Sequence, residues 1–155
     1  MRARRLHSKI APMSAFAALS SPEVGPRTRV ADAMHWGLVS CPADASLETV
    51  AALMNDERVH CIVVMQDSSD AVSLWGVVSD LDLIAAASVR RLAEQTAGGT
   101  AMTPAVTIAP SESLERAAQL MTKYAVAHLV VVDPVDRRPV GVVSTLDLAA
   151  ALAAS

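Results

Sequence analysis

The chain has 155 residues, of which 52% are hydrophobic and 19% charged, and its formal net charge is −3. This length fits one ordinary domain or two half-size units that share a core, and the apolar content excludes wholesale disorder. The acidic balance and the 3% aromatic content argue against nucleic acid as a partner. No apolar run approaches the roughly 18 residues that span a bilayer, so we expect a cytoplasmic chain without a membrane partner.

Residues 1–29 differ in composition from the rest of the chain. A basic start is followed by a stretch of small residues, which resembles a signal or transit peptide, but Pro12 interrupts the apolar region. We expect a short amphipathic helix or coil packed on the body, or an arm whose arginines touch a partner. The basic side chains are Arg2, Arg4, Arg5, His7 and Lys9.

An internal repeat organises the remainder of the chain. Ala33-Met34 recurs as Ala101-Met102, an offset of 101 − 33 = 68. The segment GVVSDLDL that starts at Gly76 recurs as GVVSTLDL from Gly141, an offset of 141 − 76 = 65. Self-similarity at a nearly fixed period predicts repeated structural units. We therefore expect a basic arm over 1–29 and two repeats over 30–90 and 91–155.

Each repeat predicts the same order of elements, β-α-β-β-α. A short strand ends at a proline, a helix with apolar residues at i, i+3, i+4 and i+7 follows, and a β-branched run comes next. After a polar loop come a valine-centred strand and an Ala-rich helix. The first four of these segments are 38–41, 47–54, 61–65 and 66–73 in the first repeat, and 106–109, 114–121, 128–132 and 133–139 in the second.

Two tandem units of this order, each with Gly-x-x-Ser-x-x-Asp where the third strand meets the second helix, resemble a pair of cystathionine-β-synthase-type (CBS) domains, or Bateman module. The resemblance covers residues 30–155. It implies an α/β (α+β) fold in which the two repeats pack their sheets around a pseudo-two-fold axis. It also implies two clefts between the repeats, which in this family commonly hold adenosine-containing ligands.

The motif spacing on its own allows two interpretations. The Ser79-Asp82 and Ser144-Asp147 pairs could each form a capping box at a helix start. The same helix starts also offer N–H groups and a partial positive charge to a phosphate, and a carboxylate to ribose hydroxyls. Both roles can coexist. Gly76 and Gly141 fit either interpretation, because a glycine in a strand marks a close approach of backbone or ligand.

The resemblance assigns roles by position. In nucleotide-binding members the motif aspartate holds the ribose and the serine lies near the phosphates, which implicates Ser79, Asp82, Ser144 and Asp147. The adenine commonly lies in an apolar slot between the first strand and the start of the second, with its amine bonded to main chain. The expected slot residues are Val39, Cys41, Pro42, Ile62, Thr107, Pro110 and Leu129.

Two histidines occupy the place where such members often carry a basic pair. Each repeat keeps one histidine, His60 or His128. The resemblance places these side chains near the phosphate of a ligand. Alternatively, each is a strand-edge residue whose imidazole forms its hydrogen bond with the backbone. In this family the basic residue of one repeat often serves the other's aspartate, so we pair His128 with Asp82 and His60 with Asp147. Phosphate-bearing ligands should then bind more tightly at about pH 6 than at about pH 8.

These observations favour a regulatory module rather than an enzyme. We expect it to need no cofactor, to bind AMP, ADP, ATP or S-adenosylmethionine, to signal to a separate regulated protein and to form a homodimer. The alternative is a ligand-free dimerisation scaffold. No nucleophilic triad, Gly-rich phosphate loop or cluster of metal ligands is recognisable in the sequence. Cys41 and Cys61 lack metal spacing and are expected to be buried thiols.

Overall fold

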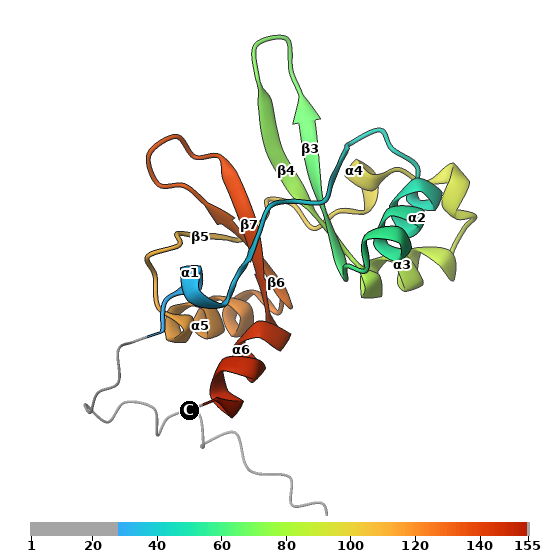
Figure 1. The fold of residues 1–155 in the computed structure, drawn as a ribbon. Coiled ribbons are helices and arrows are strands. Elements are labelled where there is room, and N and C mark those ends of the chain that lie inside the picture. Colours follow the sequence, from blue (N-terminus) through green and yellow to red (C-terminus); the bar gives the residue numbers. More distant parts are fainter. Residues whose placement is uncertain (1–27, 155) are drawn as a thin grey trace, which may run out of the picture.

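The computed structural model describes residues 28–154, so the predicted arm lies outside the described residues except for Thr28 and Arg29. Two units stand side by side, each with a sheet and two longer helices (Figure 1). The first has strand order β2-β3-β4 and the second has order β1-β7-β6-β5. The expected α/β fold with two β-α-β-β-α repeats is confirmed.

The first unit is built from residues of the first repeat. β2 runs parallel to β3, and β3 runs antiparallel to β4. The helices precede β3 and follow β4. The bounds are β2 Ser40–Pro42, α2 Leu47–Glu57, β3 Cys61–Asp67, β4 Val72–Ser79 and α3 Asp80–Ala87.

The second unit repeats this arrangement. β5 is parallel to β6 and β6 is antiparallel to β7. The bounds are β5 Thr107–Ile108, α5 Leu114–Tyr124, β6 His128–Val132, β7 Pro139–Ser144 and α6 Thr145–Ala153. Short elements connect or flank the units, namely α1 Val30–Ala33, β1 His35–Trp36, the 3-10 turn η2 Leu92–Glu94 and α4 Ala97–Thr100.

Equivalent signals begin and end the longer helices of the two units. Ser46 caps α2 by accepting from the Thr49 amide at 3.2 Å, and Ser113 caps α5 by accepting from the Arg116 amide at 3.1 Å. Both helices end at a residue in the left-handed region, Arg58 or Ala125. Such caps satisfy end groups that have no partner inside the helix.

Three apolar clusters explain why the strands are nearly continuous runs of valine. One cluster lies between the first sheet and its helices and includes Leu47 and Ile62, and a second, in the other unit, includes Ala117 and Leu129. A third is formed by Val63, Val130 and Val132 and joins the two sheets. Because both faces of the central strands are covered, both faces must be apolar.

The segment that leads into each repeat packs on the other repeat. Val30 of α1 is buried in the second core, and β1 pairs antiparallel with β7. Conversely, Ala97 of α4 is buried in the first core, and the Met102 amide donates to the Val77 carbonyl at 2.9 Å. The segment that crosses between the units is visible in Figure 1 as the blue tube that runs from α1 toward α2.

The motif glycines lie where these crossing segments touch the sheets. A Cβ at Gly76 would overlap the Met102 carbonyl, and a Cβ at Gly141 would overlap the His35 carbonyl and the Met34 side chain. Of the two interpretations left open by the sequence, the structure therefore gives a close approach of backbone.

Several predicted element boundaries are wrong. The first strand of each repeat is Ser40–Pro42 rather than 38–41 and Thr107–Ile108 rather than 106–109, and β7 already starts at Pro139, which was expected to be loop. The loop expected over 66–73 is shorter, because β3 continues to Asp67 and β4 starts at Val72, which leaves only 68–71 between the strands. This hairpin projects beyond the body (Figure 1). Both faces of this ribbon are exposed, so polar residues occur on both faces. The alternation of apolar and polar residues that identifies a half-buried strand is therefore absent.

Candidate functional site

Each Ser-x-x-Asp motif lies at the junction of the last strand and the last helix of its unit. The Ser79 amide and hydroxyl both donate to Asp82 Oδ2, at 2.8 and 2.7 Å, and the Asp82 amide donates to Ser79 Oγ at 3.2 Å. In the second unit, the Ser144 amide and hydroxyl both donate to Asp147 Oδ2 at 2.7 Å. Both motifs therefore form capping boxes, as the spacing predicts.

One carboxylate oxygen in each motif is not used by the cap. Within residues 28–154, Asp82 Oδ1 has no hydrogen-bond partner. Asp147 Oδ1 lies 3.3 Å from His35 Nδ1, and the Asp147 side chain is only 10% exposed whereas that of His35 is 80% exposed. Each motif can thus cap its helix through one oxygen and still offer the other to a ligand hydroxyl, with His35 as a competitor in the second unit.

The two motifs and the two histidines form one electrostatic neighbourhood. Burial lowers the pKa of His128, the carboxylates of Asp80, Asp147 and Asp82 oppose this by raising it, and His60 lowers it further. Groups from both units therefore act on one imidazole. His128 is half-buried and pairs in register with Ser144 at the start of β6, directly beside the second motif.

His60 lies beside a carboxylate of its own unit. Its Nδ1 is 3.0 Å from Asp80 Oδ2, and its carbonyl accepts from the Asp80 amide at 2.9 Å. No ion pair or hydrogen bond between His60 and Asp147 occurs in the described part of the chain. The pairing of His60 with Asp147 and of His128 with Asp82 stays a prediction, and Asp80 is an additional group that the sequence reasoning did not assign to the site.

The expected slot residues have different surroundings. Ile62 and Leu129 are fully buried core side chains, and Cys41 is also buried, so a ligand could meet these positions only through main chain. Val39 is half-buried and its carbonyl accepts from the Val63 amide at 3.0 Å. Pro42 is exposed.

The two remaining slot residues lie in the second unit. The Pro110 carbonyl accepts from the Ala31 amide at 2.9 Å, under the first helix. Thr107 lines a cavity of about 220 Å³ together with Arg116 and Arg137. The structure therefore brings Ser79, Asp82, Ser144, Asp147 and both histidines to the junction of the units, whereas the slot residues are distributed over cores and surfaces.

Both cysteines are buried and free, as expected. Burial, and next the charge of Asp80, raise the pKa of Cys61 to about 12, and burial raises that of Cys41 as well. Thiols held in this protonated form are poor nucleophiles and poor metal ligands. No cluster of three or more metal-binding side chains occurs among residues 28–154, and no helix in that range is long and apolar enough to cross a membrane.

Comparison with known sequences gives one family and one curated relative. A family model for the CBS domain matches residues 30–89 and 99–154. The uncharacterized protein MJ0450 of Methanocaldococcus jannaschii is 32% identical over an alignment of 111 residues, and the match covers 68% of this chain and 56% of that protein. The chain thus spans about half the length of this relative.

Solved structures share the fold. A CBS domain pair of protein MJ0100, in complex with 5′-methylthioadenosine and S-adenosyl-L-methionine, superposes with a TM-score of 0.73 at 20% identity, covering 83% of this chain and 98% of that chain. CBS domain protein PAE2072 from Pyrobaculum aerophilum, complexed with AMP, gives a TM-score of 0.70 at 25% identity, covering 83% of this chain and all of that one (100%).

Proposed function

The chain belongs to the CBS-domain family, and on that premise we propose that it is a regulatory module that binds adenosine-containing ligands between its two repeats. The observation that carries this proposal is the duplicated motif. In both repeats a carboxylate caps a helix with one oxygen and keeps the other available at the junction of the units. The similar domain pairs whose structures contain AMP, or 5′-methylthioadenosine with S-adenosyl-L-methionine, support the class of ligand.

The chemistry of the motif suits a ribose. The oxygens that the caps do not use, Oδ1 of Asp82 and Oδ1 of Asp147, would accept hydrogen bonds from ribose hydroxyls, with His35 displaced from Asp147. Such charge-assisted bonds are stronger than neutral ones. The helix starts at Ser79 and Ser144 supply a partial positive charge. A phosphate placed there would also favour the protonated form of His128, which burial disfavours in the free protein.

We further propose that the module acts on a separate regulated protein and does not catalyse a reaction. Each motif carboxylate already holds a cap with one oxygen, so the arrangement suits recognition of hydroxyl groups. The two buried free thiols support the predicted cytoplasmic location, because disulfides are rare there.

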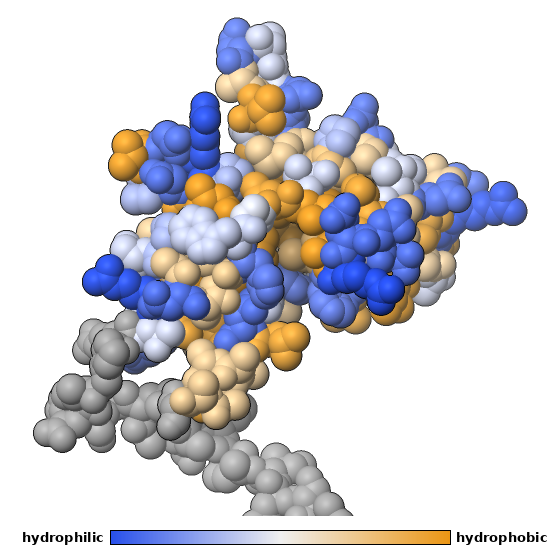
Figure 2. All heavy atoms as spheres, viewed as in Figure 1, coloured by the Kyte–Doolittle hydropathy of each residue, from blue (hydrophilic) through white to orange (hydrophobic). Residues whose placement is uncertain are grey.

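The exposed faces of the motif helices support a homodimer. Leu81 is 71% exposed and Leu146 is 69% exposed, and they occupy equivalent positions in α3 and α6, since 146 − 81 = 65 is also the motif offset. Ile84 adds to this apolar surface on α3. Figure 2 shows orange spheres over α6 at the lower end of the molecule. A two-fold axis through such faces would cover them in a closed assembly.

A thermal-shift panel tests the ligand class. AMP, ADP, ATP, S-adenosylmethionine and cyclic dinucleotides are added to the full chain at millimolar concentration. A ligand present at about 100 times its dissociation constant adds about 2.7 kcal/mol of stability, which is several degrees for a chain of this size. No shift with any adenosyl ligand would contradict the proposal and favour a dimerisation scaffold with unoccupied clefts, for which the exposed leucines supply the interface.

A further inference from the structure

The second repeat contains a cavity at the end of β6 away from the Ser-x-x-Asp motif, and the only residue it shares with the expected adenine slot is Thr107. It has a volume of about 220 Å³ and is lined by Thr107 of β5, Arg116 and Leu120 of α5, Val132 of β6, and Arg137 in the loop that follows. His128 begins β6 and Val132 ends it, so the cavity and the motif lie at opposite ends of this strand, about 13 Å apart at 3.3 Å per residue.

Two guanidinium groups give the cavity its charge. Within residues 28–154, neither Arg116 nor Arg137 has a carboxylate oxygen at ion-pair distance. Arg116 Nη1 donates a hydrogen bond to the neutral Gln119 Oε1 at 3.4 Å. Glu112 also lines the cavity, so the formal charge of the lining is +1, from two arginines and one glutamate. Unpaired arginines beside a cavity favour an anion, and guanidinium groups match carboxylates in geometry.

Arg137 is held in place by a closed turn. The Arg137 amide donates to the Asp133 carbonyl at 2.9 Å, and the Asp133 amide donates to the Arg138 carbonyl at 2.8 Å. Asp133 Oδ1 accepts from the Val135 amide at 2.7 Å. The φ of Arg137 is 62°, in the left-handed region that residues other than glycine seldom adopt. A turn fixed in this way reduces the entropy lost when a ligand is bound.

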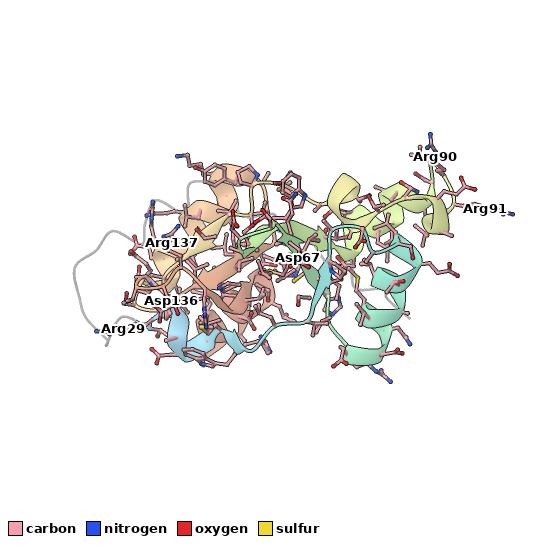
Figure 3. The ribbon with its side chains drawn as sticks, turned by 90° about the horizontal axis from the view of Figure 1, so that it is seen from above. Arg29, Asp67, Arg90, Arg91, Asp136 and Arg137 are labelled. Carbon is pink, nitrogen blue, oxygen red and sulfur yellow. The ribbon has the colours of Figure 1, made fainter. Side chains whose placement is uncertain are left out.

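The first repeat is an internal control, because it lacks these charges. The offset between the equivalent helices is 114 − 47 = 67, so Thr49 is the counterpart of Arg116 and Ala45 is the counterpart of Glu112. The loop at 68–71 in the first hairpin contains no basic residue. Figure 3 shows Arg137 at the end of the molecule opposite Arg90 and Arg91.

From these observations we propose that the cavity binds a small organic monocarboxylate with an apolar body. The arginines bind its carboxylate, and Leu120 and Val132 contact the apolar part. Glu112 disfavours a dianion such as phosphate by repulsion. The volume is below that of typical sites for drug-sized ligands, which are roughly 300–1,000 Å³, so the ligand is a small metabolite.

Amide chemical shifts in a titration of the full-length protein test this proposal, with benzoate as the probe. Saturable shifts in the amides of Arg116, Val132 and Arg137 are expected, with a weaker response to inorganic phosphate and none to benzamide, which has the same shape without the charge. Arg116→Ala or Arg137→Ala should weaken benzoate binding at least tenfold. Arg138→Ala is the matched control, because that side chain lies 3.7 Å from Asp136 and does not line the cavity.

The result is independent of the adenosine sites. The Asp82→Asn, Asp147→Asn double variant should bind benzoate as tightly as the unmodified chain does, so a failed adenosine test leaves this proposal standing. Benzoate affinity that is unchanged by both arginine variants would overturn it, and so would equal responses to benzoate, phosphate and benzamide. Both arginines are exposed, and an unchanged spectrum outside the cavity checks that each variant is folded.

Discussion

The two repeats carry the same Ser-x-x-Asp cap but place different histidines beside it. Cys61 pairs with Ser79 and His128 pairs with Ser144, so the counterpart of His128 is a cysteine. His60 lies one position earlier, with its side chain 71% exposed beside Asp80. Successive side chains of a strand point to opposite faces. A shift of one residue therefore gives one half-buried imidazole and one in solvent, and the duplicated motif yields two chemically different sites.

The residues that lead into the repeats increase this difference. His35 lies beside Asp147, whereas its counterpart in the second leading segment, Thr103, donates to the Trp75 carbonyl at 2.8 Å. The two are equivalent because 103 − 35 = 68 is also the offset between the Ala-Met pairs. Asp147 therefore has a neighbour that Asp82 lacks. If both clefts bind adenosine ligands, we expect them to differ in affinity and in response to pH.

The largest expected effect is on stability, and it concerns the motif glycine that both repeats share. Gly76→Val and Gly141→Val should each destabilise the protein by about 3 kcal/mol in urea unfolding, because the added side chain meets the backbone of a crossing segment. Gly37→Ala is the control, since its φ of 90° is unusual but no atom lies within 4 Å of the added Cβ; it should cost about 1 kcal/mol. Tolerance of Val at only one of the two motif glycines would show that the crossings are not equivalent.

The next effect separates the ligand sites. Asn at position 82 or 147 can keep the cap through its amide oxygen while its NH₂ replaces the oxygen that is left for a ribose hydroxyl. We expect at least a tenfold loss of AMP affinity for one class of site, corresponding to about 1.4 kcal/mol or more, with at most about 1 kcal/mol of lost stability. Calorimetry of Asp82→Asn, Asp147→Asn and the double variant measures this. An unchanged isotherm in the double variant would show that the ribose contact lies elsewhere.

A smaller effect comes from His128. Because its pKa is lowered in the folded protein, the neutral form is favoured there. The neutral imidazole therefore contributes stability to the folded protein at pH values above the unfolded-state pKa of about 6.5. This stability is lost as the pH falls through the lowered pKa of the folded state. His128→Gln should reduce the acid-side loss of melting temperature, and His60→Gln, at an exposed side chain, is the control. Equal pH profiles for wild type and His128→Gln would contradict this.

The same imidazole should affect ligand binding. AMP should bind more tightly at about pH 6 than at about pH 8, because a phosphate favours the protonated imidazole. Adenosine has no phosphate and should show no such preference. If AMP affinity measured by calorimetry is flat over this range, the histidines do not contact the phosphate.

The smallest expected effect concerns His35. His35→Ala should raise affinity at the Asp147 site by a few fold at most, because the lost pair has one exposed partner and such pairs are worth about 0.2–1 kcal/mol. The Asp82 site should not change. Weaker binding at the Asp147 site would mean that His35 supports the ligand instead of competing with it.

Local patterns in the sequence predicted most of the fold. The valine runs gave β3 and β6, the helical spacing gave α2 and α5, and the serine motifs gave both capping boxes. The crossing segments were missed because a two-residue strand and a four-residue helix have no periodicity to detect. Their partners are also distant in sequence, so local spacing carries no information about them.

For the candidate site, too, the sequence predicted the local motif residues but not the contacts between the repeats. Ser79, Asp82, Ser144 and Asp147 follow from the motif, but His35 reaches Asp147 from the other repeat, a contact that only the folded chain reveals. Asp80 could have been noticed from the sequence, because an acid in the first turn of a helix interacts with the helix dipole and with nearby imidazoles. The histidines were assigned as equivalent because the sequence shows residue type and does not show burial.

The exchange of leading segments makes this module a single-chain version of a domain-swapped dimer. A chain that contained only one repeat would leave one sheet without its covering helix, and it would have to take that helix from a second copy. Joining the copies in one chain replaces this association by an intramolecular one with a high effective concentration. The two halves should therefore melt as one cooperative unit, and a ligand held in either cleft should protect the half that it does not touch.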